Sequence, residues 1–285
     1  MMRPRFSVLS LALCIASVGL PVNLFCRVQD RSSELPALPS QAEVRSEEWT
    51  VRRAAFARLI GLEPETYVRV GLPSTAPVMR NILEKAPSTR DVRTLGLTQL
   101  LLTENAVVEG KSRKRIAEGL TELDEKDRLS EAYLNYHGDL IAAVVILQDL
   151  RSLDALVGAI ATGNMVTGTL VAFGKQAVAP VARQLQHPDP HVRYAAARTL
   201  SQIVTAGTAK DAISQSRLKV ALLGAAGDND AFVRREAVDG LVQLDSECIA
   251  IVERLARTDP YRAEFLDGRY LVREAALRAL QSRSK

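Results

Sequence analysis

The chain carries five copies of one nine-residue pattern, which lie about forty residues apart within each of two groups, and this repetition restricts its fold more than any other feature. Each copy begins with Val-Arg, has a small residue four positions after the valine, and has a leucine eight positions after it. The five copies begin at Val51, Val92, Val192, Val233 and Val272. Self-similarity of this length indicates a repeat architecture in which each copy is one small structural unit.

The pattern is helical, because the valine, the small residue and the leucine occupy positions 0, 4 and 8 and therefore share one face of an α-helix. The small residue lets a neighbouring helix approach closely. The arginine at position 1 lies at the edge of that face, within reach of an adjacent repeat. One helix pair cannot bury its apolar face alone, so the copies must stack. The sequence therefore predicts an all-α solenoid of about five to seven helix pairs.

Two segments contain the whole unit, which is a first helix, a turn with aspartate and a second helix that opens with Val-Arg. They read "PVARQLQHPDPHVRYAAARTLSQI" and "ALLGAAGDNDAFVRREAVDGLVQL". These segments resemble the HEAT-repeat family of α-solenoids. The resemblance covers roughly Glu47 to Ser282 and is strongest from Ala177 onward, whereas the pattern degrades between Thr103 and Ala177. It implies an armadillo-type superhelix whose role is protein binding and scaffolding.

The same helical geometry indicates which side chains face away from the core, namely those at positions 2 and 6 of each copy. In the clearest copies these residues are Tyr194, Arg198, Arg235, Asp239, Glu274 and Arg278. We interpret this set, the second-helix ridge, as a surface that contacts a protein partner. Each of its members taken singly also agrees with plain solvent exposure.

A long segment, "DPYRAEFLDGRYL", precedes the second helix of the last copy and runs from Asp259 to Leu271. It holds Tyr261, Phe265 and Tyr270 among arginines, and aromatic residues with arginine on a loop are typical of binding surfaces. They agree equally well with a cap over the end of a solenoid. The sequence leaves both interpretations open.

The run "HPDPH" raises the question of a metal site. One repeat later only its aspartate recurs, because His187 and His191 correspond to Asp228 and Phe232. Zinc usually takes three or four protein ligands, and the chain has one further histidine, the distant His137. We therefore interpret the run as a turn between helices and expect neither a metal ion nor another cofactor.

The aspartates of these turns predict a structural role. Asp189 and Asp230 stand three residues before the valines, where a helix N-cap belongs. Arg193 and Arg234 each follow four residues later, close enough for an ion pair within the turn or across repeats. Together with Arg273 of the last copy, these residues are predicted to cap helices and to form a ladder between repeats.

The N-terminal residues predict export. Residues 1–28 begin with the basic "MMRPR" and continue with "FSVLSLALCIASVGL", an apolar run of the length found in secretory signal peptides. An uncleaved membrane anchor is the alternative, because Phe6 to Cys26 is mostly apolar. Serines and prolines predict a linker over residues 29–44, followed by a repeat domain over 45–285. We expect the protein in the cell envelope, the periplasm or outside the cell, and associated with the membrane if the segment stays uncleaved.

Composition and motifs exclude several classes of function. Of the 37 basic residues, Arg3 and Arg5 lie at the N-terminus, which leaves 35 against 33 acidic residues, too even to imply a nucleic-acid partner. The chain has no His-Glu dipeptide, G-x-S-x-G, phosphate-binding glycine loop or C-x-x-C motif. We therefore expect no catalytic residues and interpret the protein as a scaffold that binds another protein. The alternative is an accessory subunit of an enzyme, or an enzyme-like protein, with a weak metal or ligand pocket in the degenerate central repeats between Leu140 and Phe173.

Overall fold

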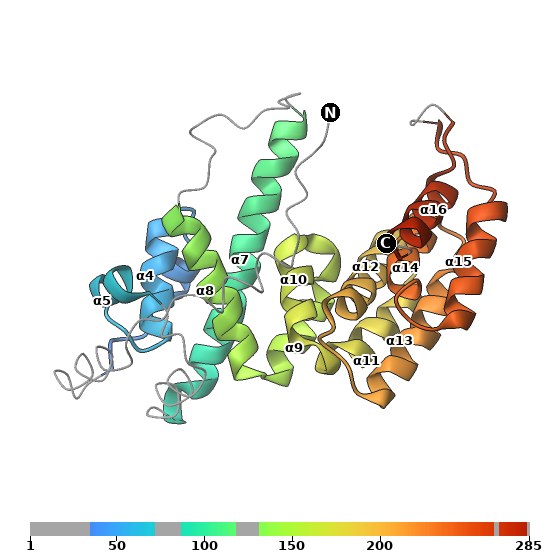
Figure 1. Ribbon diagram of the computed structural model, residues 1–285. Helices are drawn as coiled ribbons and strands as arrows, with labels where there is room; N and C mark the ends of the chain where they lie inside the picture. The colour runs from blue at the N-terminus through green and yellow to red at the C-terminus, as the bar shows by residue number, and fades with distance from the viewer. Residues whose placement is uncertain (1–34, 72–86, 118–130, 265–267, 284–285) are drawn as a thin grey trace. The chain divides into compact units, whose positions relative to one another are not determined.

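The computed structural model describes residues 35–71, 87–117, 131–264 and 268–283. The chain forms two compact units. The first comprises the described residues up to Leu156 together with Thr162–Met165, and the second comprises Val157–Ala161 and the described residues from Val166 onward. Both units consist of packed helices (Figure 1), so the predicted all-α solenoid fold is confirmed.

The first unit is arranged around helix α4. Its helices are α3 (Gln41–Val44), α4 (Trp49–Leu59), α5 (Pro64–Val70), α7 (Arg90–Ala117), α8 (Glu131–Leu147) and most of α9 (Leu150–Gly158). Helix α4 packs against α3, α5, α7 and α8. The fully buried ring of Phe56 makes edge-on contacts with the rings of Tyr67 and Tyr136, at centroid distances of 5.1 and 5.7 Å. An added Cβ at Gly96 of α7 would lie 2.7 Å from Leu59 of α4, which is the close approach that a small residue at position 4 predicts.

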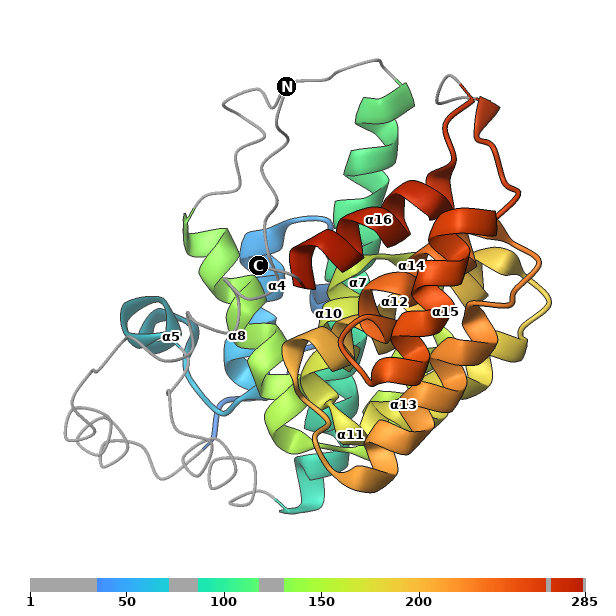
Figure 2. The ribbon, with the colours of Figure 1, turned by 45° about the vertical axis from the view of Figure 1, so that its right-hand side comes forward.

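The second unit contains three successive helix pairs. Its helices are α10 (Asn164–Phe173, from Val166 onward), α11 (Lys175–Arg183, continued by a 3₁₀ turn at Gln184–Gln186), α12 (Pro190–Ala206), α13 (Ala212–Ala225), α14 (Ala231–Leu241), α15 (Ser246–Thr258) and α16 (Leu271–Arg283). The first helices α11, α13 and α15 pack in one row and the second helices α12, α14 and α16 in another, as Figure 2 shows. The second unit is therefore a stack of helix pairs, as the repeat spacing predicts.

Local sequence explains where several of these helices begin and end. Four helices of the second unit start after an aspartate whose carboxylate accepts hydrogen bonds from backbone N–H groups of the first turn; these residues are Asp189, Asp211, Asp230 and Asp245. Such caps satisfy donors that have no partner within the helix. Helix α12 ends at Gly207, whose φ of 63° lies in the left-handed region that glycine adopts without strain.

The second unit buries the predicted core positions. In the first unit the prediction is wrong for position 0. The position-4 alanines of the last three copies and the valines of the last two are fully buried; these residues are Ala196, Ala237, Ala276, Val233 and Val272. In the first two copies, however, Val51 and Val92 are 36% and 56% exposed. The reason is that Arg52 and Arg93 take the inward position there, because each finds buried oxygen acceptors.

The N-terminal expectations fall largely outside the described residues, which begin at residue 35. The end of the predicted linker is an exception, because Gln41–Val44 forms α3. Ser40 and Glu43 make a capping box at its start, and Val44 is buried. Among the described helices, none combines the length and the apolar character that crossing a membrane requires.

Candidate protein-binding surfaces

Arginines at position 1 join consecutive repeats of the second unit. The guanidinium of Arg193 binds both carboxylate oxygens of Asp228 at 2.8 and 3.0 Å, and that of Arg234 binds both oxygens of Asp259 at 2.7 and 3.0 Å. The Nη1 group of each arginine also donates to two backbone carbonyls of the turn before its own helix, at 2.9 to 3.1 Å. Bidentate pairs of this kind are strong and geometrically specific. They fix the position of each repeat on the next.

The sequence left open whether these ion pairs form within a turn or across repeats, and the structure places them across repeats. The carboxylates of Asp189 and Asp230 cap α12 and α14 instead, by accepting the N–H groups of His191 and Phe232 at 2.8 Å. The ring of His187 accepts the N–H of Asp189 at 3.1 Å. The residues of the "HPDPH" run thus organise a turn. Within the described part of the chain, no three His, Cys, Asp or Glu side chains gather in a metal-binding group.

The second-helix ridge lies on α12, α14 and α16, where Asp239 and Arg278 are exposed and its other four members are half-buried. Many of its charges find partners close by. Arg235 pairs with Glu236 at 3.2 Å, and Glu274 pairs with Arg278 at 3.7 Å and with Arg269. Burial raises the pKa of Glu236, against the opposing charges of Arg235 and Arg198. The ridge is therefore a surface whose charges largely compensate one another.

The segment before α16 is held by short-range contacts. Within it, an antiparallel bridge joins Ala263 and Arg269. The ring of Tyr261 makes an edge-on contact with Phe232 of the preceding repeat at 6.2 Å, and Tyr270 lies under the guanidinium of Arg273 at 3.9 Å. The two tyrosines thus pack on the repeats, as a cap does, while the third predicted aromatic residue, Phe265, lies outside the described residues.

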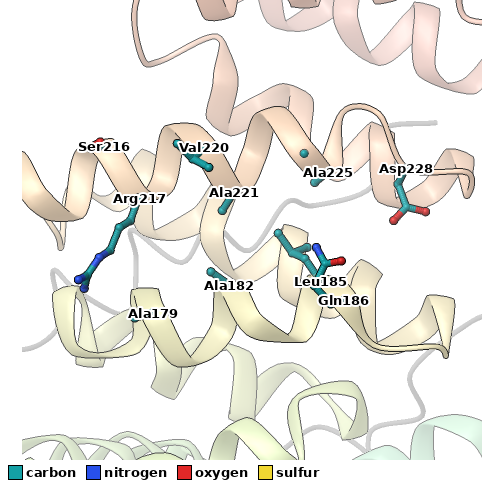
Figure 3. Close-up of a pocket in the computed structure, with 11 residues that line it drawn as sticks. Ala179, Ala182, Leu185, Gln186, Ser216, Arg217, Val220, Ala221, Ala225 and Asp228 are labelled. Carbon is teal, nitrogen blue, oxygen red and sulfur yellow. The ribbon is translucent and has the colours of Figure 1, made fainter.

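A groove of about 700 Å³ runs between the first helices α11 and α13 (Figure 3). It is lined by Ala179, Ala182, Leu185, Gln186, Ser216, Arg217, Val220, Ala221, Gly224, Ala225 and Asp228. The groove exists because small residues face each other on the two helices and leave the space between them unfilled. Val220 on its wall is 69% exposed. Arg217 and Asp228 mark its two ends in Figure 3.

The charges at the two ends of the groove differ in their pairing. Asp228 is bound by Arg193, as described above, whereas Arg217 is exposed and forms no ion pair with the described residues. The next junction, between α13 and α15, is bridged instead: Lys219 binds Asp245 and Glu247 at 2.7 and 2.6 Å. The α11–α13 groove therefore combines an open apolar wall with an available cation.

Sequence reasoning missed this groove, because it assigned binding to the second helices and a rival pocket to Leu140–Phe173. The groove begins instead at Ala179, on the first helices. A signal was present in the sequence. Small residues recur at a helical spacing in both segments, at Ala179 and Ala182 and again at Ala221, Gly224 and Ala225.

A buried polar cluster in the first unit was also missed. Glu104 of α7 is fully buried and accepts hydrogen bonds from Arg52 at 2.5 and 2.9 Å and from the hydroxyl of Tyr133 at 3.0 Å, and its carboxylate lies 3.1 Å from Nε2 of His137. Burial by itself would raise the pKa of this carboxyl. Hydrogen bonds to His137 and Arg52 outweigh it and lower the pKa to about 2. Arg52 is a position-1 arginine, so the cluster is the first unit's version of the arginine–carboxylate link.

Comparison with protein families identifies the repeat. The family model described as HEAT repeat matches residues 178–206, which run from the first turn of α11 through the turn at Asp189 to the end of α12. Residues 178–206 are therefore similar to a HEAT repeat. The pairs α13–α14 and α15–α16 carry the same Val-Arg and the same buried alanine, so the helix-pair arrangement continues beyond the matched segment. A search of curated protein sequences finds no match.

Proposed function

We propose that this protein is a non-catalytic HEAT-repeat scaffold that binds another protein in the groove between α11 and α13. The observation that carries the proposal is the groove itself, an apolar channel of about 700 Å³ with the exposed Val220 on its wall. Exposed apolar concavities mark sites where a partner's apolar side chains are buried. Proteins of this family are typically scaffolds without enzymatic activity, which supports the same interpretation.

The charge at the groove specifies the chemistry of the partner segment. A floor of alanine and glycine accommodates the large apolar side chains of a helix or an extended peptide. Arg217 stands exposed at one end without an ion pair among the described residues. A partner with an acidic residue beside its apolar stripe satisfies both features, and the arginine then sets the direction in which the segment lies.

The test compares two groove variants with a control on the same helix. Ala221→Trp fills the groove and Arg217→Glu reverses its charge, whereas Ile213→Asp changes a residue of α13 that is 66% exposed and does not line the groove. Tagged full chains are recovered from the native cell envelope, and the co-purified proteins are quantified by mass spectrometry. We expect one protein to be retained by the unchanged chain and by Ile213→Asp, and to be reduced at least 10-fold by both groove variants.

The same experiment discriminates the groove from the second-helix ridge. Asp239→Lys alters an exposed residue of that ridge and leaves the groove intact. A partner that is lost with Asp239→Lys, and retained when the groove is filled, contradicts the groove assignment and places binding on the second helices. A partner that is insensitive to every variant contradicts both.

We also propose that the scaffold acts outside the cytoplasm. The support is the basic start and the apolar run of residues 1–28. A reporter enzyme that is active only after export, fused after Gln41, should be active. Activity of a reporter that works only in the cytoplasm contradicts export. Extraction of the membranes with alkaline carbonate then separates a cleaved signal peptide, which releases the protein, from an anchor, which retains it.

A further inference from the structure

Each second helix of the second unit has one stripe that the following repeat covers, made of positions 1, 5, 8 and 9. On α12 the apolar and small members of this stripe are Ala197, Leu200 and Ser201, which are at most 4% exposed. An added Cβ at Gly240 of α14 would lie 2.7 Å from Oγ of Ser201, so the two helices are in close contact there. The position-1 residue of the stripe, Arg193, binds the carboxylate of Asp228 from the following repeat.

The same stripe of α14 is covered in the same way. Its members Val238, Leu241 and Val242 are at most 2% exposed, since α16 packs on them. Its position-1 arginine binds the carboxylate of Asp259, which lies in the turn between α15 and α16. In both α12 and α14, therefore, a helix of the next repeat buries the apolar members of the stripe, and a carboxylate from a turn binds its arginine.

On α16 two members of the stripe are exposed. Leu277 at position 5 is 48% exposed, Leu280 at position 8 is half-buried and Gln281 at position 9 is exposed. Arg273 at position 1 donates to the backbone carbonyl of Asp259 at 2.6 Å and stacks on Tyr270, and it binds no carboxylate within the described part of the chain. The outer face of α16 therefore presents an exposed apolar side chain, Leu277, and a cation, Arg273. In α12 and α14 the next repeat buries the apolar position, and a carboxylate binds the arginine.

We propose that the outer face of α16 is a docking surface for a helix pair of another protein, which continues the stack of repeats across the interface. The preceding repeats define the chemistry of that pair. It carries an aspartate or glutamate in the turn between its helices, to bind Arg273, and small residues on its second helix, to lie against Leu277. This surface is on the second helices at one end of the unit, so the proposal does not depend on the α11–α13 groove.

A second copy of this chain is a poorer occupant by charge. The carboxylate of α16 itself, Glu274, already pairs with Arg269 and Arg278. In the first repeat, the residue whose carbonyl accepts the position-1 arginine is Ser46, whereas the corresponding residue of α14 is Asp228. At the position equivalent to Asp228, the first repeat of a second copy therefore carries no carboxylate for Arg273.

The test extends the full chain by the element that covers this stripe inside the protein. A second copy of residues 207–245, which form α13, its turn and α14, is joined after Lys285 by a flexible glycine–serine linker. Tethering raises the effective concentration to the millimolar range, so that weak docking is measurable. Hydrogen–deuterium exchange of the α16 amides is followed by mass spectrometry. We expect exchange at least 10-fold slower than in the unextended chain.

Two variants of the extended chain establish whether the protection arises at this face. Asp228→Asn in the appended copy removes the carboxylate for Arg273, and Leu277→Asp places a charge in the apolar contact. Each should return α16 exchange to within about 2-fold of the unextended chain. Since Leu277 is exposed, Leu277→Asp in the unextended chain should keep an unchanged helical circular dichroism spectrum.

Two results overturn the proposal. The first is that the extension does not slow the exchange of the α16 amides, or that the exchange stays slow in both variants of the extended chain. The second comes from sedimentation velocity of the unextended chain. A dimer that Leu277→Asp converts to a monomer identifies a second copy as the occupant, contrary to the proposed partner.

Discussion

Replacing Arg234 by alanine should destabilise the second unit far more than the same replacement at Arg273. Both residues occupy position 1 of their repeats and both donate to backbone carbonyls. Arg234 also binds the carboxylate of Asp259, whose side chain is only 1% exposed, whereas Arg273 stacks on Tyr270. The pair of variants therefore compares a position-1 arginine that has a carboxylate link with a position-1 arginine that lacks one.

The expected magnitudes follow from these contacts. Arg234→Ala leaves a buried carboxylate without its counter-charge, and removal of one partner of a buried ion pair costs about 3–5 kcal/mol. Because the Arg234 side chain itself is 12% exposed, we expect about 4 kcal/mol in all, including the lost carbonyl contacts. Arg273→Ala removes one hydrogen bond and a cation–π contact with Tyr270, together about 1.5 kcal/mol.

The assay must report the second unit, since the only tryptophan, Trp49, belongs to the first. Urea titrations of the full chain, with pulse-labelling hydrogen exchange of the α14 and α16 peptides, measure the free energy of unfolding where the substitutions lie. Arg193→Ala provides an intermediate case, because its partner Asp228 is 12% exposed. We expect the order Arg234→Ala, then Arg193→Ala, then Arg273→Ala.

Equal losses for Arg234→Ala and Arg273→Ala would refute this reasoning. That result would mean that the carbonyl contacts, which both arginines make, account for the whole effect. The cross-repeat carboxylates would then contribute nothing to the stack, and the inference about the outer face of α16 would lose its electrostatic component.

Three further predictions concern other positions. Ala237→Leu should overpack the inter-repeat core and lower the free energy of unfolding, measured by urea denaturation, by about 1–3 kcal/mol. Asp239→Leu, on the exposed side of the same helix, should change it by no more than about 0.5 kcal/mol. Similar losses for the two variants would contradict the assignment of faces. The pKa of Glu104 is lowered from 4.5 to about 2. Its ionised form therefore stabilises the fold by about 3 kcal/mol above about pH 4.5, and this contribution is lost as the pH falls toward 2. Trp49 fluorescence should therefore show a shallower acid dependence in Glu104→Gln, and an unchanged dependence would argue against the buried pair. Burial raises the pKa of the Cys248 thiol, so peptide mapping after iodoacetamide treatment should find Cys248 labelled in urea and unlabelled in the native protein; rapid native labelling would show that the thiol is accessible.

The helical repeat could be predicted from the sequence because its determinants are local. Positions 0, 4 and 8 lie within about two helical turns, so the spacing of apolar and small residues predicts which face each second helix buries. The caps are equally local, since Asp189 and Asp230 accept N–H groups only two or three residues away. Where a long-range partner competes with this local preference, the prediction was wrong. Arg52 turns inward to Glu104, and Val51 is left exposed.

The surfaces of the protein were decided by tertiary structure alone. The links from Arg193 to Asp228, from Arg234 to Asp259 and from Arg52 to Glu104 span 35, 25 and 52 residues. Several carboxylates lie near each arginine in sequence, and only the packing of repeats selects one of them. The α11–α13 groove arises in the same way, because small residues on one helix leave a channel only when small residues of another helix face them across the junction. Such pairings depend on the distance and angle between helices, which no helical period within a single segment encodes.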